Sequence, residues 1–441
     1  MGNLFIGSSD DKAYKMKQGY IGVNNLAKPI KNIWVGDENN KAKLVWSAVH
    51  FDPYMCYIYG NSSNYYSYIL KEDDSNYGNR NDIKSTDKSG YDIHIVSNSG
   101  EYIVTSSQSG GFIIFKRTEN EIIKYKTLSS DVQNLPYTYN YIQKIFYLSD
   151  NATTLYAVCT GSESNNTSKV GTAVFNVSIY IAKINIIDNM LVCEKTFEIT
   201  SHNCTYADTA LRYSKADISI TKDGSKIIIG TLFYVGSNSD LSDSSSNFSE
   251  VYYLTGNLKT LNYTSECIML ENWSLSTIPL CHVSISPNGK YILYNSYEVS
   301  YDGSSMSIDG DMYISKINTD GTFTNVYKDN HETYSHAYVS NNGIATYVTE
   351  YGTTIVYYIE TKKRYGYSYD KLYINGTSVY PNEKTCECYY NDKTKQIYII
   401  TDKSRILYIN ENQIVNSSDS CLYYEGYNYA NCNNVYFYNK C

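Results

Sequence analysis

The sequence has little charge, few arginines and no long apolar run. Only 19% of its 441 residues are charged, and the net charge is -8. Because no block of basic residues occurs, we predict that the chain does not bind nucleic acid. Because no stretch of 18 apolar residues and no secretion signal occur, we predict no membrane insertion and expect a soluble protein made in a bacterial cytoplasm. The arginines are dispersed: Arg80, Arg117, Arg212, Arg364 and Arg405.

The motifs of common enzymes and cofactor sites are also missing. We find no HExxH, GxSxG, phosphate-binding loop or Rossmann fingerprint, and no arginine cluster or Asp box of a sialidase. We therefore predict no catalytic residue and no cofactor, and we predict that the chain is not an enzyme. The acidic positions that come nearest to a calcium loop lack its spacing: Asp73, Asp74, Asp302, Asp309 and Asp311.

The 11 cysteines are scattered and odd in number. The pair Cys386 and Cys388 lacks the spacing of a zinc site, and no second cluster complements it. Most cysteines lie in strand-like runs, where a free thiol behaves as a small apolar group. We predict structural thiols and no metal.

What the sequence does contain is short runs of Ile, Val, Tyr, Phe and Thr separated by Asn, Gly, Ser and Asp. This pattern predicts strands and turns, and little helix. One hairpin recurs, as in "HVSISPNGKYILYNS" from His282 and "DISITKDGSKIIIGT" from Asp217. A glycine ends each turn, where positive φ is expected. The best copies carry Gly100, Gly224, Gly289 and Gly343, and weaker copies begin at Ala48, Lys144 and Cys386.

Four strands per unit and units of roughly 45 to 60 residues predict an all-β fold, a β-propeller of about seven blades. The "SISPNGKYILY" hairpin resembles the repeats of TolB-like and WD40-like propellers over most of residues 48–441. His282 and His336 occupy the same repeat position, and His94 lies one place off. These histidines are therefore predicted to pack between blades rather than to do chemistry.

A different repeat stands at the N-terminus, where "YIGVNNLAKPI" aligns with "WVGDENNKAKLV". Two hairpins this short bury too little surface to fold alone and need a partner. The segment resembles an N-terminal element of virion proteins from tailed phages of Firmicutes. That resemblance implies a virion-docking element over residues 1–47, and the alternative is an ordinary first hairpin of the propeller. The residues expected to dock are Tyr20, Gly22, Val23, Ala27, Trp34, Val35, Gly36, Ala42, Val45 and Trp46.

Tyrosine is unusually common, with 51 copies, and many lie in polar, turn-like stretches such as "NLPYTYNY". Tyr offers a large, rigid surface with a polar tip, which suits contact with proteins and sugars. The alternative is strand tyrosine packed between blades. The loop-borne candidates for receptor binding are Tyr65, Tyr66, Tyr301, Asp302, Tyr427 and Tyr429.

Together these features predict a receptor-binding protein in the tail or baseplate of a phage or phage-tail-like particle. Its expected partners are other tail or baseplate proteins, through residues 1–47, and a bacterial surface protein or glycan, through the propeller over 48–441. Two alternatives remain open. One is a glycan-degrading propeller enzyme on the same particle, and the other is a purely structural baseplate or virion component.

Overall fold

We describe the chain from a computed structural model. It divides into two compact units, Met1–Asp52 and Pro53–Cys441. The residues described are all in strands, turns and short connections, and none of them forms a helix that could cross a membrane. The described ranges are 5–7, 13–15, 19–23, 26–30, 32–36, 42–47, 53–61, 64–71, 83–84, 90–107, 110–118, 121–163, 174–205, 213–234, 247–272, 277–301, 306–330, 337–348, 354–367, 373–374, 377–378, 385–392, 395–401, 405–410, 424–428 and 432–436.

The first unit consists of antiparallel hairpins, each a two-stranded sheet of its own. The doubled sequence forms two of these hairpins, and a further hairpin precedes them. They pair β1 (Phe5–Gly7) with β2 (Ala13–Lys15), β3 (Gly19–Val23) with β4 (Leu26–Ile30), and β5 (Asn32–Gly36) with β6 (Ala42–Ser47).

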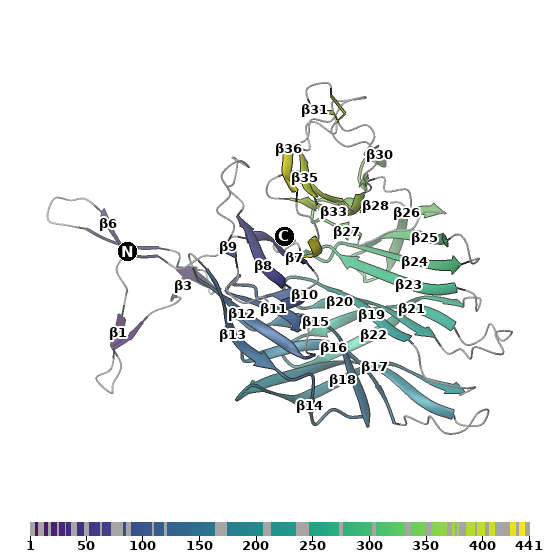
Figure 1. Cartoon of the computed structure of the whole chain (residues 1–441), viewed down its shortest axis with the longest axis horizontal. Coiled ribbons are helices and arrows are strands. Elements are labelled where there is room, and N and C mark those ends of the chain that lie inside the picture. The colour runs from purple at the N-terminus through teal and green to yellow at the C-terminus, as the bar shows by residue number, and fades with distance from the viewer. Residues whose placement is uncertain are drawn as a thin grey trace. The chain divides into compact units, whose positions relative to one another are not determined.

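The second unit is a series of sheets in which strands close in sequence pair side by side, as the colour gradient of Figure 1 shows. Three of the sheets are β10 (Gly90–Val96), β11 (Tyr102–Ser107), β12 (Phe112–Arg117) and β13 (Ile122–Leu128); β15 (Tyr139–Leu148), β16 (Thr154–Ser162), β17 (Val174–Ile187) and β18 (Met190–Thr205), with β14 (Val132–Gln133) added in parallel; and β19 (Tyr213–Ile220), β20 (Lys226–Tyr234), β21 (Asn247–Asn257) and β22 (Asn262–Asn272).

The later sheets repeat this order. One consists of β23 (Thr277–Ile285), β24 (Tyr291–Tyr301), β25 (Met306–Ile317) and β26 (Phe323–Asn330), the next of β27 (Tyr338–Val339), β28 (Ile344–Val348), β29 (Thr354–Tyr358) and β30 (Lys363–Tyr367), and the last of β33 (Thr385–Asn391), β34 (Gln396–Thr401), β35 (Arg405–Asn410) and β36 (Tyr424–Asn428). A separate pair, β31 (Tyr373–Ile374) and β32 (Thr377–Ser378), stands in the sequence between β30 and β33. The prediction of an all-β chain with little helix is confirmed.

One more sheet joins the two ends of this unit. Its order is β37 (Cys432–Tyr436), β7 (Pro53–Asn61), β8 (Asn64–Lys71) and β9 (Ile83–Lys84). The first strand of the weak repeat copy expected from Ala48 lies outside the described residues, and β7 pairs on one side with β37, from the far end of the sequence. This pairing closes the series of sheets on itself.

The recurring hairpin turns have the predicted geometry. Gly100, Gly224, Gly289 and Gly343 have φ between 67 and 72°. At the start of each turn a hydroxyl group accepts a backbone hydrogen bond from the next strand, as Ser286 Oγ does from Tyr291 N at 3.0 Å. Ser97 does the same for Tyr102, and Ser149 does so for Thr154. The local sequence alone thus encodes each turn.

Among the residues whose side chains are described, the core clusters lie between neighbouring sheets. On β20, Ile227 and Ile229 pack with the sheet before it, whereas Ile228 packs with the sheet after it. All three are 0% exposed. Side chains of a strand alternate between the two faces, so a run such as "KIIIG" is apolar throughout.

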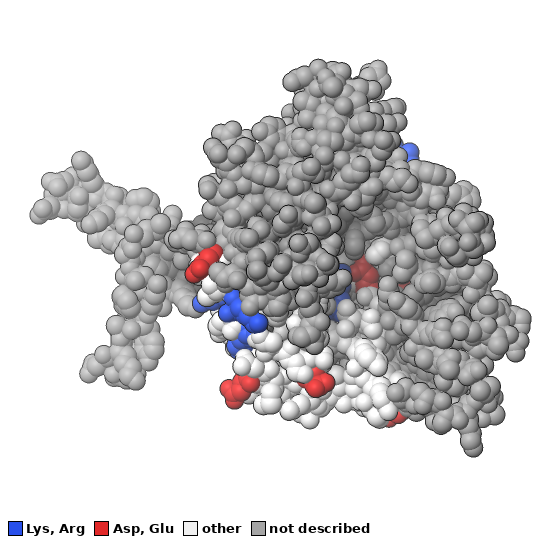
Figure 2. Space-filling view, in the orientation of Figure 1, with Lys and Arg blue, Asp and Glu red and all other residues white. Residues whose placement is uncertain are grey.

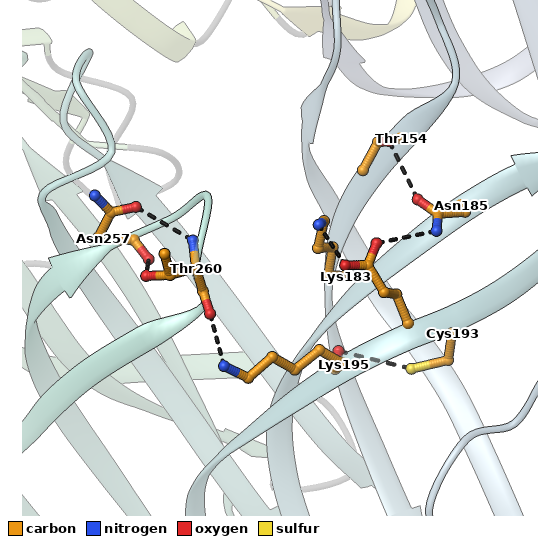
Figure 3. Close-up of polar contacts among 8 residues, drawn as sticks. Thr154, Lys183, Asn185, Cys193, Lys195, Asn257 and Thr260 are labelled. Atoms are coloured by element: carbon orange, nitrogen blue, oxygen red, sulfur yellow. Dashed lines mark hydrogen bonds and ion pairs between the residues drawn. The ribbon is translucent and has the colours of Figure 1, made fainter.

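The turns between the first and second strands of neighbouring sheets are tied to one another. Asp150 Oδ1 accepts a hydrogen bond from Ser99 N, and Asn341 Oδ1 accepts one from Asn288 N, both at 2.7 Å. At the same end of the sheets, Lys195 Nζ donates to Thr260 O at 2.7 Å, across two sheets (Figure 3). We call this end of the sheets the turn rim.

The first strands of adjacent sheets are linked in a second way. Because they belong to different sheets, their N–H groups find side-chain acceptors: Ser219 Oγ accepts from Ile285 N at 3.1 Å, and Ser284 Oγ accepts from Val339 N at 3.2 Å. Bonds of this kind satisfy donors that the sheets themselves leave unpaired.

Candidate functional site

The order of the strands defines a second rim, opposite the turn rim. In a four-stranded meander the second and third strands connect at the end away from the first turn, and the fourth strand leads to the next sheet at that same end. We call this end the loop rim. The described strand ends at this rim include the end of β16 (Ser162), the start of β17 (Val174), the end of β20 (Tyr234) and the start of β21 (Asn247).

Four of the six predicted receptor-binding residues are described, and by this topology they fall in strands at the loop rim rather than in loops. Tyr65 and Tyr66 lie at the start of β8, opposite Gly60 and Tyr59. Tyr301 is the last residue of β24, and Tyr427 lies in β36. The loop interpretation of these four was wrong, because β-branched and aromatic residues around them extend the strands to the turns. Asp302 and Tyr429 lie outside the described residues.

A polar and aromatic cluster at the loop rim was not among the selected candidates. It lies in the stretch "NLPYTYNY", where the Tyr137 hydroxyl is 2.6 Å from Glu198 Oε2 and 2.7 Å from Ser178 Oγ. Burial and the Glu198 carboxylate raise the pKa of Tyr137. Tyr141 on β15 is 65% exposed and, because side chains of a strand alternate, lies on the opposite face of the sheet from Asn140, which accepts a hydrogen bond from the buried Tyr180. An exposed tyrosine ring is suited to contact with a sugar or a polar peptide.

Room for this cluster comes from a glycine. A Cβ at Gly161 on β16 would overlap the ring of Tyr137. The sequence signal was a Tyr-rich polar stretch directly before a strand, but nothing local distinguished Tyr141 from the buried Tyr180. Their difference arises from the fold: Tyr180 lies on β17, inside its sheet, and packs in a core cluster, whereas Tyr141 lies on β15, at the edge of that sheet.

A buried carboxylate lies between two sheets near the same rim. Glu250 on β21 is 4% exposed, and its Oε2 is 3.1 Å from His202 Nε2 on β18. Thr200 Oγ1 lies 2.9 Å from the same imidazole nitrogen. The group bridges two sheets, so its evident role is to hold them together near the end of β18 and the start of β21.

Charged groups of the first strands form a chain across several sheets. Asp217 on β19 lies 2.6 Å from Lys144 Nζ on β15 and 3.4 Å from His282 Nδ1 on β23, and its Oδ2 also accepts a hydrogen bond from Val283 N. Burial would raise the pKa of Asp217, but Lys144 and His282 outweigh it and hold that pKa well below its usual range. The three strands are thereby cross-linked.

His94 continues this chain on β10. Its Nδ1 accepts a hydrogen bond from Ile145 N at 3.3 Å, and burial together with the charge of Lys144 lowers its pKa to about 4. The prediction that His94 and His282 pack between blades is confirmed. His336 lies outside the described residues.

The thiols and tyrosines follow the packing interpretation for the most part. Cys159, Cys193 and Cys388 are buried in strands, whereas Cys267 is exposed. Most tyrosines with described side chains are partly or fully buried, and Tyr125 and Tyr141 are the exposed ones. Asp311, a position considered for calcium, forms an ion pair with Lys328 at 2.8 Å. Side chains of both charge signs appear among the described residues in Figure 2.

In the first unit, all of the predicted docking residues lie in β3 to β6. Gly22 pairs with Ala27 in one hairpin, and Gly36 pairs with Ala42 in the next. The hairpin of β1 and β2 has the same pair, Gly7 opposite Ala13. Sequence reasoning missed this copy, although "IGSSDDKA" has the Gly-to-Ala spacing of "VGDENNKA".

The four-stranded sheets, closed by the pairing of β37 with β7, carry the fold assignment, and comparison with known proteins finds propeller structures among the similar ones. No family model and no curated protein matches the chain. Among solved structures, the chain is similar to the Dos1 propeller, at 9% identity and a TM-score of 0.39, with 83% of this chain and 78% of that chain covered. The chain is an all-β propeller. The count of about seven blades and the phage resemblance stay predictions.

Two other similar structures are enzymes. Oligogalacturonate lyase in complex with manganese is 10% identical, with a TM-score of 0.36 and 76% and 78% of the two chains covered. The dihydro-heme d1 dehydrogenase NirN in complex with DHE is 9% identical, with a TM-score of 0.38 and 92% and 80% covered. These neighbours contradict the prediction that the chain is not an enzyme, which we correct. At such low identity the likeness concerns the fold alone and assigns no activity.

Proposed function

We propose that the chain is a receptor-binding protein of a phage or phage-tail-like particle. Residues 1–47 attach it to tail or baseplate proteins, and the loop rim of the propeller contacts a protein or glycan on the bacterial surface. Several copies on one particle then convert modest single-site affinity into firm attachment.

The observation that carries this proposal is the difference between the two rims. The turn rim is tied from sheet to sheet, for example by Asp150 and Asn341. The loop rim carries the exposed Tyr141 and, by topology, the strand ends with Tyr65, Tyr66 and Tyr301. The sequences 163–173 and 235–246, which follow β16 and β20, are rich in Ser and Asn, and together with tyrosine this is the composition of a recognition surface.

The test is binding of the purified full chain to cell-wall and S-layer fractions of candidate host bacteria. We expect the chain to be retained, and Tyr141→Ala to weaken retention roughly tenfold, as for an aromatic group at the centre of a contact. Tyr125→Ala is the matched control, because Tyr125 is also an exposed tyrosine (43%) but lies on β13, the last strand of its sheet.

Two outcomes would contradict the proposal. If no fraction retains the chain, or if Tyr125→Ala weakens retention as much as Tyr141→Ala, the loop rim is not the recognition surface. Sugar released into the supernatant of the same samples would point to degradation of the receptor rather than to adhesion.

A further inference from the structure

Two strands of neighbouring sheets carry metal-binding types of side chain at alternate positions. Thr200 and His202 are two residues apart on β18, and Glu250 and Tyr252 are two residues apart on β21. Because side chains of a strand alternate between its two faces, each pair lies on one face. Val251, between the second pair, packs on the other side of its sheet. Contacts between the two pairs show that all four side chains enter the same space between the sheets.

Three atoms of this cluster lie close to one another. His202 Nε2 is 2.9 Å from Thr200 Oγ1 and 3.1 Å from Glu250 Oε2, and the two oxygens are 3.5 Å apart. The Tyr252 hydroxyl forms hydrogen bonds with Thr200 and Glu250, and burial raises its pKa, so that it stays a neutral phenol. One nitrogen and three oxygens therefore converge on one point.

Hydrogen bonds alone satisfy this arrangement poorly. An imidazole nitrogen either carries one hydrogen or presents one lone pair. A hydrogen on His202 Nε2 has to be shared between Thr200 and Glu250, which weakens both bonds. A lone pair on the same nitrogen accepts from Thr200 but faces the negative oxygen of Glu250 at 3.1 Å. A cation at the common point attracts all of these atoms at once.

The carboxylate of Glu250 also needs a counter-charge. Its side chain is only 5% exposed, and within the described part of the chain its one ion pair is with His202. Charged groups are buried in proteins when they are paired with an opposite charge or when they bind a metal ion. The His202 side chain is 29% exposed, so the cluster can be reached from solvent.

The spacing of the atoms suits a metal ion. Ligand atoms about 2.1 Å from one ion are about 3.0 Å apart in an octahedral site and about 3.4 Å apart in a tetrahedral site. The observed separations of 2.9, 3.1 and 3.5 Å span these values. A set with an imidazole nitrogen favours Zn²⁺ or a similar transition metal, whereas Ca²⁺ and Mg²⁺ take oxygen ligands.

We propose that Thr200, His202 and Glu250, with Tyr252 beside them, bind a divalent transition metal ion of the Zn²⁺ class that links β18 to β21. The ion neutralises the buried carboxylate and fixes two neighbouring sheets near the loop rim. This inference does not depend on the proposed function. It replaces the sequence-based prediction of no metal, because ligands from two sheets have no characteristic spacing along the chain.

The test is calorimetric titration of the metal-free full chain with Zn²⁺. We expect one bound equivalent, and both His202→Gln and Glu250→Gln should weaken its affinity by at least roughly a hundredfold, since even the partners of metal ligands contribute 10- to 100-fold. Thr200→Val should weaken it by roughly tenfold. Zn²⁺ should also raise the melting temperature of the wild type, as a ligand of the folded state does, and leave those of the first two variants unchanged.

Glu266→Gln is the matched control, because Glu266 is an exposed glutamate on β22, in the same sheet as Glu250, and the same charge is removed. Ca²⁺ is the control ion and should not bind. Co²⁺ in place of Zn²⁺ separates this site from the cysteines, because a thiolate ligand adds a strong near-ultraviolet band and nitrogen and oxygen ligands do not. That spectrum is measured on the wild type, so it tests the site even if a variant fails to fold.

The inference is overturned if the wild type binds no Zn²⁺, or if it binds Ca²⁺ equally well. It is also overturned if His202→Gln and Glu250→Gln bind Zn²⁺ as the wild type does, or if bound Co²⁺ shows the thiolate band. In each of these cases the cluster is a hydrogen-bonded ion pair between two sheets, and any metal belongs to other residues. Binding of the chain to host wall fractions is measured separately and is not affected by these outcomes.

Discussion

Replacing Asp217 should destabilise the propeller more than replacing any surface carboxylate, because this side chain joins three consecutive sheets. Its carboxylate is 18% exposed, lies 2.6 Å from Lys144 Nζ and also accepts a hydrogen bond from Val283 N. Removing one partner of a fully buried pair costs about 3 to 5 kcal/mol. Since 35% of the Lys144 side chain is exposed, water can solvate part of its charge, and we expect about 2 to 3 kcal/mol for Asp217→Ala.

The assay is urea unfolding followed by tyrosine fluorescence and far-UV circular dichroism at pH 7. Asp311→Ala is the matched control, because Asp311 pairs with Lys328 at a similar 2.8 Å, within one sheet and with both partners about one third exposed or more. It should cost less than about 1 kcal/mol. If the two substitutions cost the same, cross-linking of the first strands does not stabilise the ring, and the reasoning is refuted.

Asp217 also predicts the direction of an acid effect. Its pKa in the folded chain lies below that of the unfolded chain, so its contribution is present above pH 3.8 and is lost as the pH falls through the lower, native value. Asp217→Asn should flatten this part of a stability profile measured below pH 4. A profile identical to that of the wild type would contradict the assignment.

Two more predictions concern His94 and the turns. Because the pKa of His94 is about 4 in the fold against 6.5 in the unfolded chain, stability should fall by about 3 kcal/mol as the pH drops from 6.5 to 4, and His94→Gln should remove most of that slope in urea titrations. Gly224→Ala should lower the free energy of unfolding by about 2 kcal/mol, because the residue has a φ of 70° and its new Cβ would lie 2.9 Å from Leu258 Cβ. Gly110→Ala should lower it by only about 1 kcal/mol, because nothing lies within 4 Å of the new Cβ. Equal melting temperatures for the two glycine variants would show that the turn tolerates a side chain.

The turns and hairpins were predictable because their determinants lie close together in the sequence. A hydroxyl residue, a polar pair and a glycine encode each turn, as at Ser286 and Gly289, and apolar runs on either side encode the strands. The continuous apolar runs follow from sheets covered on both faces. Most tyrosines in those runs whose side chains are described are partly or fully buried, which agrees with the alternative that strand tyrosine packs between blades.

The closure of the ring and the composition of the loop-rim cluster were not predictable in the same way. The pairing of β7 with β37 joins positions as far as 380 residues apart, Cys56 with Tyr436, and no local pattern predicts it. Tyr137 meets Glu198 only because the chain passes from β14, which pairs with β18, to β15 at the other edge of the same sheet. The hairpin of β1 and β2 was missed for another reason. Only its Gly and Ala positions match the other two copies closely, and Tyr14 stands where Lys28 and Lys43 occur in them.

The division of the chain into an attaching segment and a recognising propeller is tested most directly by a variant that lacks residues 1–47. We measure how much of it sediments with particles assembled in its presence, relative to the full chain. The account predicts that the shortened chain folds, still binds host wall fractions and stays in the supernatant. Sedimentation with the particles at the level of the full chain would contradict it.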